Sequence, residues 1–283
     1  MRIEFTKMHG AGNDFIIING FKYQISEDKY IQLARKLCKR HFSIGGDGLI
    51  IVLPAKDKIN DFRMRIFNSD GSEAEMCGNG IRCFAHFLKG EELTDKNNFQ
   101  IETLAGIISP EITSYKENES QVKVNMGKPR FKPEEIPIEL NQNLEYLKNY
   151  ELKVEGKIFE INCVSMGNPH TIIFTENIEN YKLDLWGPKI ENHFLYPEKT
   201  NVEFIEIISD TEIKMKVWER GAGRTLACGT GAAASVVAGI KNEYLDTEVL
   251  VHLPGGDLEI EWEGSDVLMT GPSRKVFNGN IKI

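Results

Sequence analysis

Basic and apolar residues alternate in two stretches of the chain, residues 63–67 and 214–218, which match each other position by position at an offset of 151. An alternation with a period of two is typical of a strand that buries one face. After Gly80, and again after Gly231, apolar residues recur at helical spacing. The pattern therefore predicts a strand, a polar loop and a helix in each stretch.

Each predicted helix begins at a cysteine. The sequence Cys-Gly-x-Gly occurs at residues 77–80 and again, at the same offset of 151, at residues 228–231. We interpret the match as a duplication that places one cysteine at the same point of each half. The first N–H groups of a helix lack partners within the helix and, together with the helix dipole, attract negative charge. We therefore expect Cys77 and Cys228 to have pKa values below the ordinary thiol value of about 8.5.

The rest of the pattern predicts many short strands and few helices. Strands are expected at residues 2–7, 15–18, 49–53, 99–103, 107–113, 121–125, 159–164 and 202–208, and helices at residues 30–38, with Ser26 as a cap, and 183–194. After residue 248 further strands are expected, separated by turns at residues 254–256 and 271–272.

This pattern predicts an α+β fold of two pseudo-symmetric domains from a duplication. Each domain would wrap mostly antiparallel strands around a central helix headed by the Cys-Gly-x-Gly motif. The length of 283 residues suits two domains, and three prolines between residues 128 and 137 mark the crossing between them. The predicted halves are residues 1–128, which carry Cys77, and residues 129–273, which carry Cys228, with the active site in the cleft between them.

The composition argues against several partners. The chain has 34 basic and 42 acidic residues, a net charge of −8, and no basic run that would follow a phosphate backbone. Its apolar runs are shorter than the roughly 20 residues that span a bilayer, and its first residues read as a strand rather than a signal peptide. We therefore expect no nucleic-acid partner, no membrane partner and a cytoplasmic location.

The five cysteines, an odd number scattered at positions 38, 77, 83, 163 and 228, are expected to be free thiols. Cys38, Cys83 and Cys163 fit the core. No Cys-x-x-Cys or His-x-x-x-His spacing occurs, so no metal site is expected. Residues 229–234 match the dinucleotide-binding fingerprint Gly-x-Gly-x-x-Gly/Ala. In that fingerprint the glycines directly follow a strand, whereas here a long polar loop intervenes, which argues against a dinucleotide site.

Two equivalent thiols that face each other across a cleft suit a reaction that is nearly symmetric. One thiolate removes a proton from one face of a carbon as general base, and the opposing thiol delivers a proton to the other face as general acid. Such a pair titrates together and is active only when singly protonated. The N–H groups of Gly78, Asn79, Gly229 and Thr230, at the two helix starts, would stabilise the negative charge that develops on an adjacent carboxylate.

Motifs along nearly the whole chain match one known family. They are Lys7-Met8-His9-Gly10, Gly12-Asn13-Asp14-Phe15, Phe67-Asn68-x-Asp70-Gly71-Ser72-Glu73, Cys77-Gly78-Asn79-Gly80-x-Arg82, Met166-Gly167-Asn168-Pro169-His170, Asn201-Val202-Glu203-Phe204 and the run from Glu219-Arg220-Gly221 to Cys228-Gly229-Thr230-Gly231. With these motifs the chain resembles the diaminopimelate epimerase family. Proline racemase relatives share the paired Cys-Gly-x-Gly units, but the Glu-Arg-Gly-x-Gly-x-Thr run and the two asparagine turns resemble those of the epimerase.

The resemblance implies a cofactor-independent isomerase that interconverts L,L- and meso-2,6-diaminoheptanedioate, a step before lysine and peptidoglycan precursors. It makes Cys77 and Cys228 the acid–base pair, with the first as proton donor and the second as acceptor for the L,L substrate. It also gives His170 and Glu219 supporting roles in catalysis. The positions expected to contact substrate are Asn13, Asn68, Gly78, Asn79, Asn168, Asn201, Glu219, Arg220, Gly229 and Thr230.

The same resemblance implies a homodimer and a last strand, residues 274–283, that returns to the first domain. One position departs from the family. Gly48 stands where many members carry a glutamine that touches substrate, so this contact is either absent or made by the backbone.

Other interpretations stay open at this point. A proline or hydroxyproline racemase would turn over a substrate with one carboxylate and would tolerate Arg220→Ala. A dithiol redox or binding protein would form a Cys77–Cys228 disulfide as its functional state. The simpler alternative for His170 is a packing role in the turn after Pro169.

Overall fold

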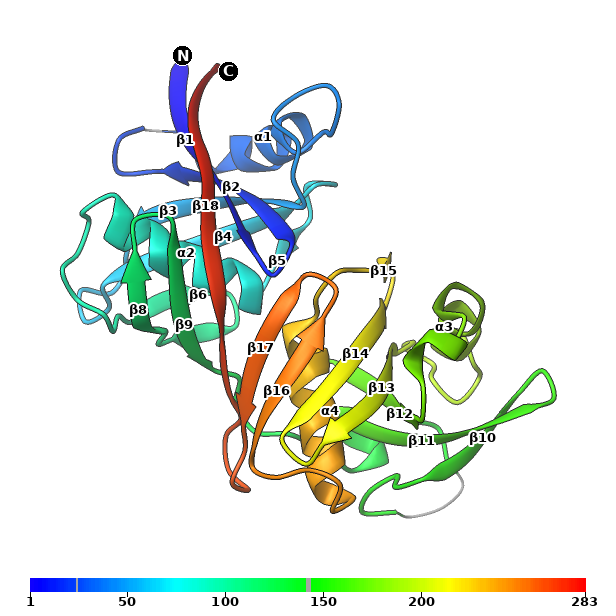
Figure 1. The fold of residues 1–283 in the computed structure, drawn as a ribbon. Helices are drawn as coiled ribbons and strands as arrows, with labels where there is room; N and C mark the ends of the chain where they lie inside the picture. The colour runs from blue at the N-terminus through cyan, green and yellow to red at the C-terminus, as the bar shows by residue number, and fades with distance from the viewer. Residues whose placement is uncertain (24, 141–143) are drawn as a thin grey trace. The chain divides into compact units, whose positions relative to one another are not determined.

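The computed structural model describes residues 1–23, 25–140 and 144–283, which form two compact units (Figure 1). Unit 1 comprises Met1–Asn125 and Thr270–Ile283, and unit 2 comprises Met126–Met269. The boundaries expected from the sequence lie after residues 128 and 273. Strands paired into a large sheet, together with few helices, make this a mixed α/β fold.

Unit 1 is built on strands that lie next to one another in the order β18, β1, β2, β3 and β4. Its elements are β1 (Arg2–Gly10), β2 (Asn13–Asn19), η1 (Glu27–Lys29), α1 (Tyr30–Leu37), β3 (Gly48–Pro54), β4 (Phe62–Asn68), β5 (Glu73–Ala74), α2 (Gly78–Gly90), β6 (Ile101–Thr103), β7 (Gly106–Ile108), β8 (Glu111–Lys116), β9 (Glu119–Asn125) and most of β18 (Leu268–Lys282). β1 pairs antiparallel with β18 and β2, β2 pairs in parallel with β3, and β3 pairs antiparallel with β4. The pairing of β1 with β18 brings the two chain ends side by side in this unit (Figure 1).

Helices cover both faces of these strands. Leu49 and Ile51 of β3 belong to the apolar core under α1, whereas Ile50 lies against Gly80 at the start of α2. Successive strand residues face opposite sides, so a strand covered on both faces reads as a continuous apolar run. α2 is itself buried from residue 79 to residue 88, and Figure 1 shows it among the strands of unit 1.

Unit 2 repeats the use of one buried helix and one covering helix. Its elements are η2 (Pro133–Glu135), β10 (Tyr150–Val154), β11 (Lys157–Ser165), β12 (Pro169–Thr175), η3 (Ile178–Asn180), α3 (Leu183–Glu191), β13 (Asn201–Ser209), β14 (Glu212–Glu219), β15 (Gly223–Arg224), α4 (Gly229–Lys241), β16 (Glu248–Leu253) and β17 (Gly256–Glu261). β11 pairs antiparallel with β12, β12 in parallel with β13, β13 antiparallel with β14, and β14 in parallel with β16.

The two faces of the central strands of unit 2 pack against different helices. Phe204 of β13 shares an apolar core with Leu183 and Ile190 of α3. On the α4 side, the hydroxyl of Ser235 lies 3.5 Å from the Sδ atom of Met215 in β14. The central strands and α4 are therefore buried together.

Three of the features predicted from the sequence take another form in the structure. The strand expected at residues 107–113 is two strands, β7 and β8, because Pro110 between them has no N–H for a ladder. The turn expected at Gly271 and Pro272 lies inside β18, in a part that precedes the ladder with β1. Ser26 takes the N-cap position of η1 and makes no side-chain cap bond, so it does not cap α1.

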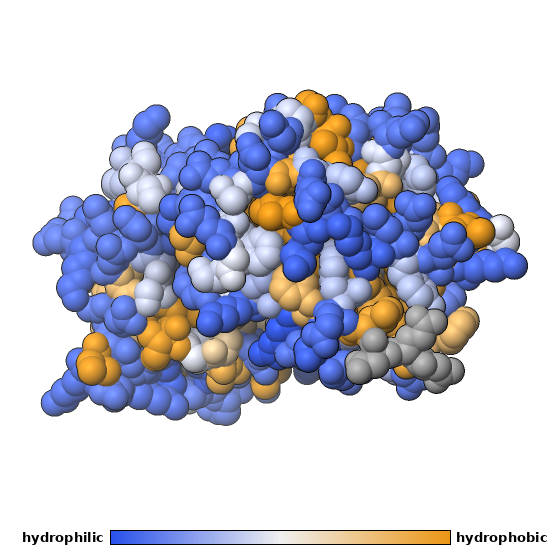
Figure 2. Space-filling view, turned by 90° about the horizontal axis from the view of Figure 1, so that it is seen from below, coloured by the Kyte–Doolittle hydropathy of each residue, from blue (hydrophilic) through white to orange (hydrophobic). Residues whose placement is uncertain are grey.

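Hydrophilic residues cover most of the face shown in Figure 2, and apolar residues are scattered among them. Exposed apolar side chains such as Phe42, Ile59 and Phe194 are ordinary on a protein surface. Among the described helices, none is both long and apolar enough to cross a bilayer.

The contact between α3 and β14 gives a test of the packing in unit 2. A Cβ atom on Gly187 of α3 would lie 2.6 Å from Cγ of Trp218. We expect Gly187→Ala to lower the free energy of unfolding by about 1–3 kcal/mol, because the helix must move away from the ring. Urea unfolding followed by circular dichroism measures the change.

Gly90 at the end of α2 is the matched control, because a Cβ there would meet only the hydroxyl of Tyr115, at 3.4 Å. We expect Gly90→Ala to change the unfolding free energy by no more than about 0.5 kcal/mol. Equal effects of the two substitutions would contradict the packing described for α3.

Candidate active site

Cys77 is the N-cap residue of α2, with extended backbone angles (φ −144°, ψ 120°), and the N–H of Gly80 donates to its Sγ atom (3.4 Å). A side-chain acceptor at the N-cap satisfies one of the N–H groups that a helix start leaves unpaired. The short strand β5, which the sequence did not predict, folds back on β4 and leads the chain to this helix start. Gly80 is closely packed, since a Cβ there would lie 3.0 Å from Cδ1 of Ile66.

The side-chain oxygen of Asn13 faces Cys77. The thiol of Cys77 donates to Oδ1 of Asn13 (3.6 Å), and Nδ2 of Asn79 donates to the same oxygen (3.4 Å). Nδ2 of Asn13 in turn donates to Oδ2 of Asp47 (2.8 Å). The structure thus brings three predicted site residues of unit 1 into direct contact.

Asn68 lies at the end of β4, where it is the ladder partner of Gly48, and its Nδ2 donates to the hydroxyl of Ser72 (3.0 Å). A Cβ atom on Gly48 would lie 3.0 Å from the carbonyl oxygen of Phe67 and 3.2 Å from the ring of Phe15. A larger residue at position 48 would therefore have to displace the Phe15 ring.

Arg82 is a buried cation near the start of α2 that the sequence analysis did not assign to the site. Its guanidinium donates to Oδ1 of Asn79 (2.8 Å), to the carbonyl oxygen of Gly78 (3.1 Å) and to that of Pro272 (3.2 Å). Burial lowers the pKa of Arg82. One feature of the sequence could have pointed to Arg82. It is a charged residue between the apolar helix positions 81 and 84, where packing alone does not require a charge.

Asp14 and Asp47 anchor the turn that carries Asn13. Nζ of Lys7 lies 2.5 Å from Oδ2 of Asp14, and Arg40 lies 2.5 Å from Asp14 and 2.8 Å from Asp47. Burial alone would raise the pKa of Asp14, but the hydrogen bonds from Arg40 and Lys7 lower it to about 2. Asp14 therefore remains ionised well into the acid range.

Cys228 takes the same position in unit 2, at the N-cap of α4 (φ −128°, ψ 110°), and the N–H of Gly231 donates to its Sγ atom (3.4 Å). The hydroxyl oxygen of Thr230 lies 3.5 Å from the same sulfur. The two-residue strand β15, also not predicted, folds onto β14 just before this helix start.

The prediction of a lowered pKa is wrong for Cys228. The residue is only 5% exposed. Burial raises the pKa of its thiol well above the ordinary value, and the negative charges of Glu219 and Glu203 raise it further. Hydrogen bonds from Thr230 and from the N–H of Gly231 act in the opposite direction, but they do not offset burial. Cys228 therefore rests as a neutral thiol at neutral pH.

Glu219 and Arg220 lie together where β14 ends. The Glu219 carboxylate accepts a hydrogen bond from the hydroxyl of Thr225, and burial raises the pKa of Glu219. The N–H of Arg220 donates to Oδ1 of Asn201 (2.8 Å), and its exposed guanidinium donates to the carbonyl oxygen of Glu198 (3.1 Å). Asn201 thus fixes the backbone from which the Arg220 side chain projects.

A series of hydrogen bonds leads from Glu203 to Cys228. His170 and Glu203 are fully buried, and their Nδ1 and Oε1 atoms are 2.7 Å apart. Nε2 of His170 lies 3.0 Å from Oδ1 of Asn168, and Nδ2 of Asn168 donates to the hydroxyl of Thr230 (3.3 Å), next to the sulfur. His170 lies in β12 with both ring nitrogens hydrogen-bonded, which is more than a packing role in a turn requires.

Glu203 is a second residue that the sequence analysis did not assign. Burial raises the pKa of its carboxyl group, and the bond to His170 opposes this. The sequence feature that could have pointed to Glu203 is its position in the apolar strand β13, where an acidic residue lies between Val202 and Phe204.

The predicted site residues fall into one group in each unit. Unit 1 contains Asn13, Asn68, Cys77, Gly78 and Asn79, and unit 2 contains Asn168, His170, Asn201, Glu219, Arg220, Cys228, Gly229 and Thr230. All five cysteines are free thiols, and Cys38, Cys83 and Cys163 are buried, as predicted. In the part of the chain that the structure describes, no cluster of three or more His, Cys, Asp or Glu side chains is arranged to hold a metal ion.

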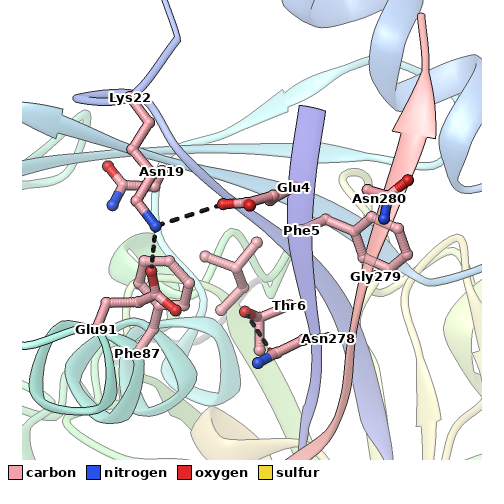
Figure 3. A pocket seen from close by; sticks show the side chains of 11 residues that line it. Glu4, Phe5, Thr6, Asn19, Lys22, Phe87, Glu91, Asn278, Gly279 and Asn280 are labelled. Carbon is pink, nitrogen blue, oxygen red and sulfur yellow. Dashed lines mark hydrogen bonds and ion pairs between the residues drawn. The ribbon is translucent and has the colours of Figure 1, made fainter. Parts of the chain in front are cut away.

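A cavity of about 340 Å³ in unit 1 lies among β1, β2, β18 and the end of α2, and no predicted site residue lines it. Lys22 at this cavity is paired with Glu91 (3.0 Å) and Glu4 (3.5 Å), and Thr6 donates to Asn278 (3.0 Å) (Figure 3). Its polar groups bind one another, so we assign it no ligand.

Solved structures define the class of fold. A phenazine biosynthesis protein of the PhzF family from Bacillus anthracis has a TM-score of 0.71 at 18% identity, with 100% of each chain covered. A hydroxyproline epimerase from Agrobacterium vitis has a TM-score of 0.69 at 14% identity, with 99% of this chain and 92% of that chain covered. The chain therefore has the mixed α/β fold shared by PhzF proteins and proline racemase relatives.

The family is shown by sequence. The model of the family described as diaminopimelate epimerase matches residues 5–132 and 162–276. A diaminopimelate epimerase from Halothermothrix orenii is 62% identical over 283 residues, which cover 100% of this chain and 99% of that protein. The chain belongs to the diaminopimelate epimerase family and is an isomerase, which confirms the resemblance seen in the motifs.

The raised pKa of Cys228 predicts slow alkylation at neutral pH. Iodoacetamide reacts with the thiolate, so the pH midpoint for modification of Cys228, followed by mass spectrometry, should lie above that of an ordinary thiol. We expect Glu219→Gln to lower this midpoint by about one pH unit, because it removes a negative charge beside the sulfur.

Glu248→Gln is the matched control, because it removes an exposed carboxylate of the same unit at the start of β16. It should leave the midpoint unchanged. A Cys228 midpoint below that of an ordinary thiol, or one that does not respond to Glu219→Gln, would contradict the electrostatics described here.

Proposed function

We propose that this isomerase interconverts L,L- and meso-2,6-diaminoheptanedioate, a step before lysine and peptidoglycan precursors, with Cys77 and Cys228 as its acid–base pair and no cofactor. One observation carries the proposal. Each cysteine is the N-cap of a buried helix, and its sulfur accepts the N–H of the third helix residue at 3.4 Å. Membership in the epimerase family supports the choice of substrate.

We infer that the two units arose by duplication and form the two domains of the enzyme, with substrate bound in a cleft between them. The same order of elements supports this: β4, β5 and α2 in one unit, and β14, β15 and α4 in the other. The cleft is a proposal that follows from the chemistry, because one thiol must reach each face of the reacting carbon.

In the proposed mechanism, one thiolate removes the α-proton while the other thiol delivers a proton to the opposite face. The N–H groups at the starts of α2 and α4 stabilise the charge that develops on the α-carboxylate; they belong to Gly78, Asn79, Gly229 and Thr230. For the L,L substrate, Cys77 is the donor and Cys228 the acceptor.

Cys228 must lose its resting proton before it can act as acceptor. We assign this proton to Glu219, because burial raises the pKa of Glu219 and its charge acts on the sulfur. A carboxylate whose pKa is raised toward neutrality exchanges a proton more readily with a thiol than an ordinary carboxylate does. His170 is connected to the sulfur of Cys228 by hydrogen bonds through Asn168 and Thr230, and it thereby helps to hold Thr230 beside that sulfur.

Substrate recognition follows from the remaining polar groups. The exposed guanidinium of Arg220 binds the distal carboxylate, for which its planar fork of donors is suited. Side-chain amides recognise the ammonium groups, as does Glu219 while it is a carboxylate; the amides are those of Asn13, Asn68, Asn168 and Asn201.

The test is the exchange of the α-hydrogen of diaminopimelate with solvent. In deuterium oxide the wild-type protein should introduce deuterium at the α-carbon, which NMR detects. Cys77→Ala and Cys228→Ala should each lower interconversion roughly 10²- to 10⁴-fold, because each removes one general acid–base group. Cys38→Ala is the control, since it changes a cysteine of the apolar core and should retain exchange.

Failure to incorporate deuterium while both thiols are reduced would sink the proposal. Arg220→Ala tests the choice of substrate, because it removes the partner of the second carboxylate. We expect it to raise KM for diaminopimelate about 10- to 100-fold. A racemase for a substrate with one carboxylate would be nearly insensitive to this substitution.

We also propose, on the family resemblance, that the protein works in the cytoplasm as a homodimer. Sedimentation equilibrium at micromolar protein should give twice the chain mass of 32.1 kDa. A mass of one chain at all concentrations tested would contradict the dimer.

A further inference from the structure

A series of hydrogen bonds beside Cys77 has a charged group at each end. Arg82 donates to Oδ1 of Asn79 (2.8 Å), Nδ2 of Asn79 donates to Oδ1 of Asn13 (3.4 Å), and Nδ2 of Asn13 donates to Asp47 (2.8 Å). All four residues belong to unit 1. The family motifs and the proposed function assign no role to Asp47.

The charged ends decide which way round the two amides lie. A side-chain amide has a donor end and an acceptor end of nearly equal size, so shape alone does not orient it. A guanidinium only donates, and an ionised carboxylate only accepts. Arg82 therefore requires the oxygen of Asn79, and Asp47 requires the nitrogen of Asn13, which leaves the oxygen of Asn13 facing Cys77.

Both ends of the series are themselves held in place. Arg82 is fully buried and also donates to the carbonyl oxygens of Gly78 and Pro272. Asp47 also accepts from Arg40 (2.8 Å) and from the N–H of Asp14 (2.9 Å). Neither charged group can turn away without losing several hydrogen bonds.

The orientation of Asn13 matters for the state of the sulfur. An amide oxygen accepts the hydrogen of a thiol, and the observed contact from Cys77 to Oδ1 of Asn13 (3.6 Å) is of this kind. The same oxygen carries partial negative charge and would repel a thiolate. If Asn13 turned over, its N–H would instead donate to a thiolate and favour the charged form.

We propose that Asp47 is a positioning residue of the Cys77 site, which holds the Asn13 amide with its oxygen toward Sγ and thereby favours and aims the protonated thiol. Arg82 holds the far end of the series through Asn79. The use of this proton on a substrate rests on the proposed function, whereas the orientation of the amide does not.

Several charged or titratable groups surround this sulfur and belong to the account of its ionisation. Arg82 and Cys83 of α2 interact electrostatically with Cys77 itself. Farther along the series, Asp47, before β3, pairs with Arg40, after α1, and Arg40 and Lys7 of β1 both pair with Asp14 of β2. A test has to separate the charge of Asp47 from its effect on Asn13.

A double-mutant cycle makes this separation. The pH midpoint for alkylation of Cys77 by iodoacetamide is measured by mass spectrometry in the wild type, Asp47→Asn, Asn13→Ala and the double variant. Asp47→Asn lets Asn13 turn its nitrogen toward the sulfur, so the midpoint should fall by about one pH unit. In the Asn13→Ala background the same substitution should leave the midpoint unchanged.

A midpoint that does not fall in Asp47→Asn, or that falls equally in both backgrounds, would overturn the proposal. Asp14→Asn is the matched control, because it removes a neighbouring carboxylate that accepts no hydrogen bond from the Asn13 side chain. It should lower the midpoint less than Asp47→Asn does, and an equal shift would show that charge alone acts.

A second measurement decides the matter if Asp47→Asn does not fold. The infrared S–H stretching band of Cys77, assigned with Cys77→Ser, should lie at the lowered frequency of a hydrogen-bonded thiol in the wild type. The frequency of an unbonded thiol would overturn the proposal. Both measurements are made without substrate, so they hold whether or not the proposed reaction is confirmed.

Discussion

A hydrogen bond from a helix N–H to a cysteine sulfur is the contact on which the arrangement around the cysteine depends in each unit. In each unit the cysteine side chain takes the place that a serine or aspartate has at an ordinary N-cap. At the start of α4 this bond is buried, so the N–H of Gly231 would otherwise be unpaired away from water, at a cost of about 1–3 kcal/mol. The bond that completes the helix therefore also fixes the position of the sulfur.

Burial and the helix start act on this sulfur in opposite directions, and their magnitudes decide the outcome. A helix terminus stabilises a nearby charge by up to about 2 kcal/mol, which is less than two pKa units. Complete burial shifts a pKa by as much as 3–5 units. For Cys228, which also faces the charges of Glu219 and Glu203, burial prevails and the resting thiol is protonated. In the proposed mechanism, the N-cap bond then serves to stabilise a thiolate that forms only during the reaction.

Features with a local pattern were predictable from the sequence, and features that depend on packing were not. The alternation in β4 and β14, the helical spacing in α2 and α4 and the cysteine at each helix start are all local. Asp47 lies far along the chain from Asn13, which it orients, and Glu203 lies in an otherwise apolar strand, so neither could be assigned. The prediction of a turn at Gly271 and Pro272 was wrong, because a strand tolerates a proline at a position whose backbone nitrogen makes no ladder hydrogen bond. The ionisation of Cys228 depends on how much of the chain covers it, which no local pattern determines.

The proposed mechanism, in which two thiols act on opposite faces of one carbon, determines where the hydrogen of the product comes from. The most direct measurement is the hydrogen content of substrate and product in the first turnover of α-deuterated L,L-diaminopimelate in ordinary water. One thiolate takes the deuterium and the other thiol delivers solvent hydrogen, so the product should carry hydrogen at the reacting carbon while unreacted substrate keeps its deuterium. Product that retains the deuterium would contradict two opposed thiols, because a single group would then have removed and returned the same atom.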